Sequence, residues 1–418
     1  MTAKYIILRI ILSLLSRFLS HSLSLSPLTL SPLSLIFLFP TLFLCLKSYC
    51  AAEFLLSLFL ILIFSVLRSK HPLEGRQLIV QDAFFASLSE KLVRNDPSSE
   101  LLVALSRCTE VKLSHGMRAI HCGHNIEGVF IGADIIFTRD FYEDFLCDIR
   151  LHHKKCCTVG NPGIGKSQFQ FYYLARIMNP DLFGELPPNF NGCTDSPKIV
   201  VRQVGTTMTV YDIERAVAYV GEASSSLLEC FDPEVTLYLF EPAQWETDQP
   251  FFSEIDHSTL ATISPDSTRY KEFCKNGATQ MKMPIYTRDE LLAAGDYLLK
   301  QSHFPEAMKD LYSPLNIAKR HDEFGGIFRH VLPTSVKSLE TYYKKRQLAI
   351  DNCNAKEILS NRYSIEGERV SSFVLAMIVV KSGEGRFSKY AIDFVSVDII
   401  AAAMSSSFIR AIFAWKAA

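Results

Sequence analysis

The sequence lacks a charge excess of either sign. Lysine and arginine number 43, aspartate and glutamate number 44, and the formal net charge over 418 residues is −1. Proteins that bind nucleic acid through its phosphate backbone usually carry a large basic excess. The composition therefore argues against general nucleic-acid binding and favours a protein that acts on small ligands and protein partners.

The eleven cysteines lack the spacing of a disulfide or zinc framework. Their number is odd, and no Cys-x-x-Cys pair occurs. Two clusters combine His and Cys, 121–124 and 152–157, but neither has a second ligand pair at zinc spacing. Cys156 and Cys157 are also adjacent in a predicted strand, where neighbouring side chains point to opposite faces. We expect structural roles for both clusters, and reduced thiols in an intracellular compartment, cytoplasm or nucleus.

Residues 1–75 contain no glycine before Gly75 and no charged side chain in their central part, although residues 1–70 carry six basic residues against one acidic residue. No Asp, Glu, Lys or Arg occurs from Phe18 to Leu46, and the segment is rich in Leu, Ser, Phe and Pro. Two stretches, Pro27–Leu46 and Phe54–Leu67, are candidates for entering a bilayer. Basic residues at both ends favour a hairpin with both termini in the cytosol, which would make the protein membrane-anchored.

The same composition has two other interpretations. Leu, Ser, Phe and Pro share pyrimidine-rich codons, so a translated polypyrimidine tract would produce a similar run. A secretion signal fits less well, because the apolar region is long and no small-x-small site follows the first residues. Residues 1–75 are thus a hydrophobic low-complexity segment, for which a gene-model artefact and a membrane hairpin both stay open.

The rest of the chain has a globular composition and divides into four predicted parts. Residues 76–150 are a small helical or mixed region, 151–302 a core domain, 303–345 a helical lid and 346–418 an α/β remainder. Helices are predicted at Gln77–Val93, Glu100–Ser106, Thr138–Arg150 and, as a core helix, Val370–Val380. Ser98 or Ser99 is the expected N-cap of the second helix.

The most informative motif is a glycine-rich loop. Gly160, Gly165, Lys166 and Ser167 match the pattern G-x-x-x-x-G-K-S, between a predicted strand at Lys155–Val159 and a predicted helix at 168–178. Glycines let backbone N–H groups surround phosphate oxygens, the lysine reaches the β- and γ-phosphates, and the serine ligates Mg²⁺. The expected phosphate-binding residues are Gly160, Asn161, Pro162, Gly163, Ile164, Gly165, Lys166, Ser167 and Gln168.

A phosphate loop of this kind also needs an acid to hold the metal ion. Glu241 follows the apolar run Val235–Phe240, which is typical of a buried strand, and it would share Mg²⁺ with Ser167. Pro242 follows, so no second acid lies beside Glu241 to polarise an attacking water, which predicts slow hydrolysis. The alternative interpretation makes Glu241 a solvated residue at a strand end.

Further strands and a lid complete the predicted domain. Strands are expected at 198–204 and 260–264, and Ser264 would end the latter where a γ-phosphate sensor lies. Thr287–Glu290 is a capping box that opens a helix at 291–299. Arg329 follows Gly325 and Gly326 and is either a lid residue facing the γ-phosphate or an ordinary surface arginine.

These blocks, in this order, resemble the P-loop NTPase module shared by Crinkler proteins and the retrotransposon hot spot (RHS) proteins of trypanosomes. The resemblance covers roughly 135–335, and Tyr142 fits the segment before the loop. Phe328 stands where the family usually has proline, no ubiquitin-like N-terminal module is recognisable, and about 85 residues follow the lid. The matching blocks are 160–167, 237–242, 263–272, Met283-Pro284, Glu290-Leu291 and 325–332.

The resemblance implies a STAND- or AAA-like α/β fold: a parallel sheet with flanking helices and a helical lid. It also implies a nucleotide switch that uses ATP or another NTP with Mg²⁺, in an effector delivered to host cells and often to the nucleus. By position, Lys166 and Ser167 bind phosphate and Mg²⁺, Glu241 is the Walker B acid, and Ser264 and Arg329 are the two sensors.

Three functional hypotheses follow. The first is a Crinkler-like NTPase that binds Mg-ATP, hydrolyses it slowly and signals to a protein partner. The second is an interaction protein that keeps the fold without turnover. The third is a membrane-anchored NTPase, which depends on residues 1–70.

Overall fold

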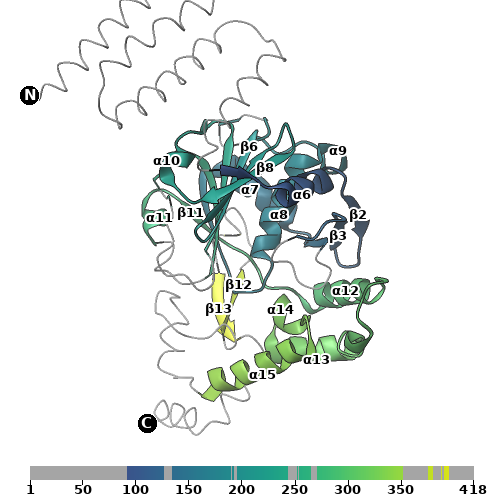
Figure 1. Ribbon diagram of the computed structural model, residues 1–418. Helices are drawn as coiled ribbons and strands as arrows, with labels where there is room; N and C mark the ends of the chain where they lie inside the picture. The colour runs from purple at the N-terminus through teal and green to yellow at the C-terminus, as the bar shows by residue number, and fades with distance from the viewer. Residues whose placement is uncertain are drawn as a thin grey trace, which may run out of the picture. The chain divides into compact units, whose positions relative to one another are not determined.

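The computed structural model (Figure 1) describes residues 92–126, 134–189, 191–192, 195–242, 252, 254–264, 271–351, 375–379, 387 and 390–394. All of them belong to one compact unit, Phe85–Ala418. The predicted hydrophobic segment and most of the helix predicted at 77–93 lie outside the described residues. Among the residues described, no helix is both long enough and apolar enough to cross a membrane.

An eight-stranded mixed sheet forms the centre of this unit (Figure 1). Its last five strands are parallel to one another and its first three are antiparallel. The coarse fold prediction, a mixed α/β protein with a large, mostly parallel sheet and flanking helices, is therefore confirmed. In spatial order the strands are β1 (Leu92–Arg94), β8 (Val217–Glu222), β7 (Thr207–Asp212), β6 (Ile199–Val204), β9 (Thr236–Glu241), β10 (Ser258–Ile263), β5 (Lys155–Val159) and β11 (Thr279–Lys282).

The parallel strands end together at one edge of the sheet. Ile263 of β10 pairs with Val159 of β5, and Glu241 of β9 pairs with Val204 of β6. Strands β9 and β10 are buried along nearly their whole length, as expected for strands covered on both faces. This common edge is where the glycine-rich loop leaves β5.

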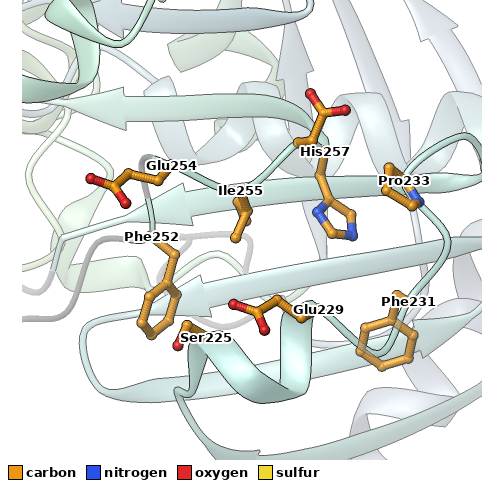
Figure 2. Close-up of a pocket in the computed structure, with 9 residues that line it drawn as sticks. Ser225, Glu229, Phe231, Pro233, Phe252, Glu254, Ile255 and His257 are labelled. Atoms are coloured by element: carbon orange, nitrogen blue, oxygen red, sulfur yellow. The ribbon is translucent and has the colours of Figure 1, made fainter. Parts of the chain in front are cut away.

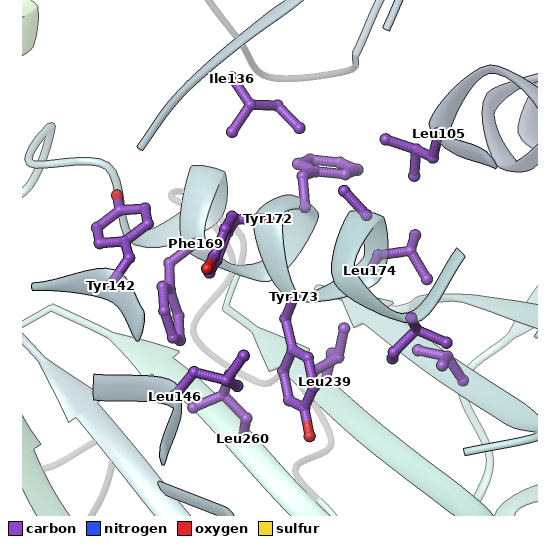
Figure 3. Close-up of a cluster of buried hydrophobic side chains, with 14 of the residues drawn as sticks. Leu105, Ile136, Tyr142, Leu146, Phe169, Tyr172, Tyr173, Leu174, Leu239 and Leu260 are labelled. Atoms are coloured by element: carbon purple, nitrogen blue, oxygen red, sulfur yellow. The ribbon is translucent and has the colours of Figure 1, made fainter. Parts of the chain in front are cut away.

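Helix α8 (Lys166–Met178) is the central helix on one face of the sheet. Its nine residues from Phe169 to Ile177 are all buried, because the sheet lies on one side and further elements cover the other. The covering elements include α6 (Asp96–Ser106), α7 (Tyr142–His152) and β4 (Ile135–Thr138). Figure 3 shows Phe169 and Tyr173 of α8 close to sheet residues Leu239 and Leu260.

A second hydrophobic core joins the small sheet to the helices of the predicted lid. The small sheet consists of β2 (Thr109–Lys112), β3 (Arg118–His121) and β4. Phe137 of β4 lies in this core beside Tyr297 and Phe328, with ring centroids 6.3 Å and 5.8 Å apart. Of the helices in this core, α12 (Arg288–Leu299) lies within the predicted core domain. The predicted lid, 303–345, contains the 3₁₀ turn η2 (Glu306–Met308), α13 (Pro314–Phe324), α14 (Phe328–Val331) and most of α15 (Val336–Asp351).

Shorter elements complete the described chain. They are α9 (Pro180–Phe183), α10 (Ser225–Leu228), α11 (Lys271–Lys275), and the antiparallel pair β12 (Leu375–Val379) and β13 (Tyr390–Phe394). The core helix predicted at Val370–Val380 is wrong, because residues 375–379 form a strand. A short apolar run has no periodicity that separates a strand from a buried helix.

The region before the core domain also differs from its prediction in three places. Leu92 and Val93 are in strand β1, which pairs with β8, and not in a helix. Asn95, rather than Ser98 or Ser99, caps α6, and its side chain accepts a hydrogen bond from the Ser98 N–H at 2.8 Å. The helix predicted from Thr138 begins at Tyr142, because Thr138 ends β4 and pairs with Arg118.

Candidate functional site

The glycine-rich loop lies between β5 and α8, as the sequence predicts. Gly163 and Gly165 have φ angles of +83° and +92°, which other residue types rarely adopt. Gly160 has a different constraint, because a Cβ there would lie 2.5 Å from Ile164 Cδ1 and 3.1 Å from the Met283 carbonyl oxygen. Ile164 itself is fully buried. The loop therefore needs glycine at all three positions to take this path before α8.

Lys166 is the first residue of α8, and its side chain turns back over the loop. Its Nζ donates hydrogen bonds to the carbonyl oxygens of Gly160 at 2.7 Å and Asn161 at 2.9 Å. Loss of hydration lowers the pKa of Lys166 to about 7, while the Glu241 carboxylate opposes the shift and Arg329 adds to it. The ammonium group is thus held at the loop among other charged groups.

Glu241 is the last residue of β9, and both of its carboxylate oxygens have partners. Ser167 Oγ donates a hydrogen bond to Oε1, and Arg202 Nη2 donates to Oε2 at 2.9 Å. The structure therefore brings together Ser167 and Glu241, the two predicted metal ligands. A solvated Glu241 at a strand end does not fit these contacts.

Arg202, which is not among the predicted site residues, lies on β6 beside Glu241. Its Nε donates to Gln170 Oε1 at 3.1 Å, and its guanidinium lies 4.7 Å from the centroid of the Phe171 ring. The sequence contains a signal for this contact, since an arginine inside the apolar run of a predicted buried strand needs a buried partner.

Gln170 of α8 connects the helix to the two strands beside the loop. Its Nε2 donates to the Phe240 carbonyl oxygen at 3.1 Å and to Thr262 Oγ1 at 2.9 Å. These hydrogen bonds join α8 to β9 and β10 directly below the site. Ser264, the predicted first sensor, immediately follows β10 and is half-buried.

Arg329, the predicted second sensor, is brought to the loop. Its backbone N–H donates to the Gly163 carbonyl oxygen at 3.4 Å, and a Cβ on Gly163 would lie 2.8 Å from Arg329 Cβ. Phe328 is the first residue of α14. The centroid of its ring lies 5.8 Å from that of Phe137 and 5.1 Å from that of Tyr286.

A buried ion pair fixes the segment between the sheet and the lid. Arg139 donates to both carboxylate oxygens of Glu290 at 2.9 Å, and also to the carbonyl oxygens of Pro284 and Ile285 at 2.6 Å each. Glu290 completes the predicted capping box with Thr287, which is confirmed. Arg139 is not among the predicted site residues, because the pair spans 151 residues and no local pattern indicates it.

Two tyrosine side chains lie against the loop, Tyr142 from α7 and Tyr286 from the segment between β11 and α12. A Cβ on Gly165 would be 2.9 Å from the Tyr286 hydroxyl and 3.2 Å from the Tyr142 hydroxyl. Burial raises the pKa of Tyr286 to about 12, and it raises that of Tyr142 as well. Both hydroxyls therefore stay protonated and neutral. Gln168 Oε1 lies near Gly165 and is buried without a hydrogen-bond partner.

A cavity of about 580 Å³ lies elsewhere in the molecule (Figure 2). Pro233, which precedes β9, and His257, which precedes β10, both line it, together with Glu229 and Glu254. The cavity is thus at the N-terminal ends of the parallel strands, whereas the glycine-rich loop is at the C-terminal edge of the sheet. None of the predicted site residues lines it.

The residues that the structure describes contain no group of three or more His, Cys, Asp or Glu side chains arranged to hold a metal ion. Both candidate magnesium ligands, Ser167 and Glu241, nevertheless offer oxygen atoms, which Mg²⁺ prefers. A scan against protein-family models and a search of curated proteins found no match to the chain.

Proposed function

We propose that this chain is a Crinkler-like P-loop NTPase module that binds Mg-ATP and hydrolyses it slowly as a conformational switch. The observation that carries the proposal is the pairing of the loop with the acid. Lys166 and Ser167 begin the helix that follows the glycine-rich loop. Ser167 contacts Glu241 at the end of β9, which is two strands away from β5 in the sheet. Each residue type is the one that phosphate and Mg²⁺ binding requires.

The loop residues would bind the phosphates through their backbone and through Lys166. The N-terminus of α8 carries a partial positive charge and free N–H groups, both of which favour an anion. Lys166 would exchange the carbonyl oxygens of Gly160 and Asn161 for phosphate oxygens. Mg²⁺, held by Ser167 and Glu241, would supply positive charge to the phosphates.

Nucleotide binding would change contacts that reach beyond the loop. For Mg²⁺ to bind, the hydrogen bond between Ser167 and Glu241 must open, and Arg202 must share the carboxylate with the metal. The Gly163 carbonyl meets the backbone of Arg329, so a shift of the loop is transmitted to α14. Slow turnover follows from Pro242, which leaves no second acid beside Glu241 to orient water.

One observation favours a second function, an interaction protein without turnover. Glu241 is engaged on both oxygens by groups of the protein itself, Ser167 and Arg202. In that case the carboxylate stabilises the junction of α8, β6 and β9, and nucleotide is not needed. The membrane-anchored alternative depends on residues outside the described part of the chain.

Calorimetric titration of the full chain with Mg-ATP tests the proposal. The natural chain should bind, and Lys166→Ala should lose affinity by about tenfold or more, because a charge-assisted contact to phosphate is lost. Lys198→Ala is the matched control, since Lys198 directly precedes β6 and forms an exposed pair with Glu214 at 2.8 Å. A phosphate-release assay on the same samples measures turnover. Binding without release would contradict the hydrolysing switch, and no binding by the natural chain would overturn the first function and leave the interaction protein.

A further inference from the structure

Cys157 faces away from the core that surrounds α8. Its neighbour Cys156 belongs to that core, and adjacent residues of a strand point to opposite faces. Strand β11 pairs with β5 so that Gln280 is opposite Cys157 and Lys282 is opposite Val159. Lys282 therefore lies on the same face of the sheet as Cys157. It is on the neighbouring strand, opposite the residue two positions after Cys157.

Helix α11 brings a second thiol to this face. A tight turn links α11 to β11, in which the Gly277 N–H donates to the Cys274 carbonyl oxygen and the Ala278 N–H to that of Phe273, both at 3.2 Å. Phe273 is buried, and Cys274 beside it is only half-buried. Cys274 is therefore reachable from solvent, whereas Cys157 is fully buried.

The three side chains interact with one another. A side-chain hydrogen bond with Cys157 lowers the pKa of Cys274 to about 7, partial burial opposes the shift, and the Lys282 ammonium adds to it. Lys282 is almost completely buried, and loss of hydration lowers its pKa to about 8, against the effect of the two cysteines. A buried cation is stabilised by an anionic neighbour, and the Cys274 thiolate is such a neighbour.

We propose that Cys274 is a site of oxidation by hydroperoxides, with Cys157 as the thiol that resolves it to a disulfide. The site combines the half-buried Cys274 thiol, the buried Lys282 ammonium on the same sheet face as Cys157, and the Cys157 thiol within hydrogen-bonding reach of Cys274. The inference does not depend on the proposed nucleotide function.

The chemistry needs one hydroperoxide and no other reactant. The Cys274 thiolate attacks the terminal oxygen of hydrogen peroxide, an S–O bond forms, the O–O bond breaks, and hydroxide leaves and takes a proton. The Cys157 thiol then attacks the sulfenic sulfur, the S–S bond forms, and the hydroxyl leaves as water with the thiol proton. Two thiols lose two electrons, and one peroxide becomes two waters.

The natural full chain contains its own control for this proposal. Cys230 is exposed, and its thiol donates to the Ser226 carbonyl oxygen at 3.1 Å. Reduced protein is treated with a small excess of hydrogen peroxide at neutral pH, and each cysteine peptide is followed by mass spectrometry. Cys274 should oxidise on the order of tenfold faster than Cys230, and a Cys157–Cys274 linked peptide should appear. Faster oxidation of Cys230 would overturn the proposal.

Variants separate the role of each group. Cys157→Ser should leave Cys274 as a sulfenic acid that dimedone traps, with no linked peptide. Lys282→Met should slow oxidation of Cys274 without changing Cys230, and Lys282→Arg should restore part of the rate because it restores the cation. An unchanged Cys274 rate in a folded Lys282→Met variant contradicts the role of the lysine. If that variant fails to fold, the oxidation rates of Cys274 and Cys230 in the natural chain still test the proposal.

Discussion

Gly163 is constrained both by its backbone and by its neighbour. Its φ of +83° costs about 1 kcal/mol for any residue with a Cβ. A Cβ at position 163 would also lie 2.8 Å from Arg329 Cβ. That atom is bonded directly to the backbone, so it can move away only if the backbone of Arg329 moves too. Gly163→Ala should therefore lower the free energy of unfolding by about 2–4 kcal/mol, the backbone cost plus that of overpacking, as measured by urea denaturation.

Gly277→Ala is the matched control for this substitution. Gly277 has a φ of +86°, almost the same as Gly163, but no atom lies within 4 Å of its Cβ position. Only the backbone cost of about 1 kcal/mol is expected there. Equal destabilisation by the two substitutions would mean that Arg329 does not press on the loop.

The low pKa of Lys166 predicts that the proposed phosphate binding depends on pH. Phosphate needs the charged ammonium, and in the folded chain this group loses its proton as pH rises through about 7. Affinity for Mg-ATP should therefore fall as pH rises from about one unit below this pKa to about one unit above it, and binding on the alkaline side should take up a proton. Calorimetry in buffers of different ionisation enthalpy measures that uptake.

Lys166→Arg provides the comparison, because a guanidinium stays charged over this range. Its binding should lack the proton uptake, while the ionisation of ATP itself affects both proteins equally.

The lowered pKa of Lys166 also affects the stability of the fold. The folded pKa, about 7, lies below the ordinary value of 10.5, so the unfolded chain binds more protons between these two pH values, and this residue's contribution to stability rises with pH.

At the scale of elements, α12 depends on a distant residue. Its N-terminus is closed locally by Thr287 and Glu290, but the Glu290 carboxylate is also held by Arg139 from the end of β4. Arg139→Met leaves that buried carboxylate without its cation, which costs about 3–5 kcal/mol. Thermal and urea unfolding should show this loss.

The control for Arg139→Met lies on the same helix. Lys300 and Asp296 form an exposed pair at the C-terminal end of α12, at 2.6 Å. Lys300→Met should change the free energy of unfolding by less than about 1 kcal/mol, because exposed pairs contribute little. Similar effects of the two substitutions would contradict the bracing role of Arg139.

The elements that the sequence predicts correctly are those whose signal is local. The strand Lys155–Val159, the loop after it and the capping box at Thr287 each lie within a few residues, and the structure confirms all three. The strand pair β7 and β8 was not predicted, although Gly205, with a φ of +60°, lies in the two-residue turn that leads from β6 into it.

The contacts that the sequence could not provide join residues far apart in the chain. Arg202 and Glu241 come from neighbouring strands, and Arg139 and Glu290 from different layers. Hydrophobic periodicity predicts that each element is buried, but not which charged residues meet there. The position of Arg329 at Gly163 also depends on how the lid packs, which no local pattern records.

At the scale of the whole described unit, the candidate site lies where two hydrophobic cores meet. The loop and α8 belong to the core on the sheet, whereas Tyr286 and α14 belong to the core of the lid helices. Backbone hydrogen bonds hold this junction at the loop: the Arg329 N–H reaches Gly163, and the Tyr286 N–H donates to the Gly326 carbonyl oxygen at 2.9 Å. A ligand held by the loop would therefore affect the lid through these contacts.

Hydrogen exchange of backbone amides tests this coupling. Saturating Mg-ATP should slow exchange in the loop, 160–167, and in the lid turn, 325–332, together, because ordering of Gly163 also orders the amide of Arg329. Strand β2, at the edge of the small sheet, is the internal control and should not change. Lys166→Ala should lose the protection in both segments. Protection of the loop without the lid turn would keep nucleotide binding but contradict the switch, because the lid would then not respond to the bound phosphates.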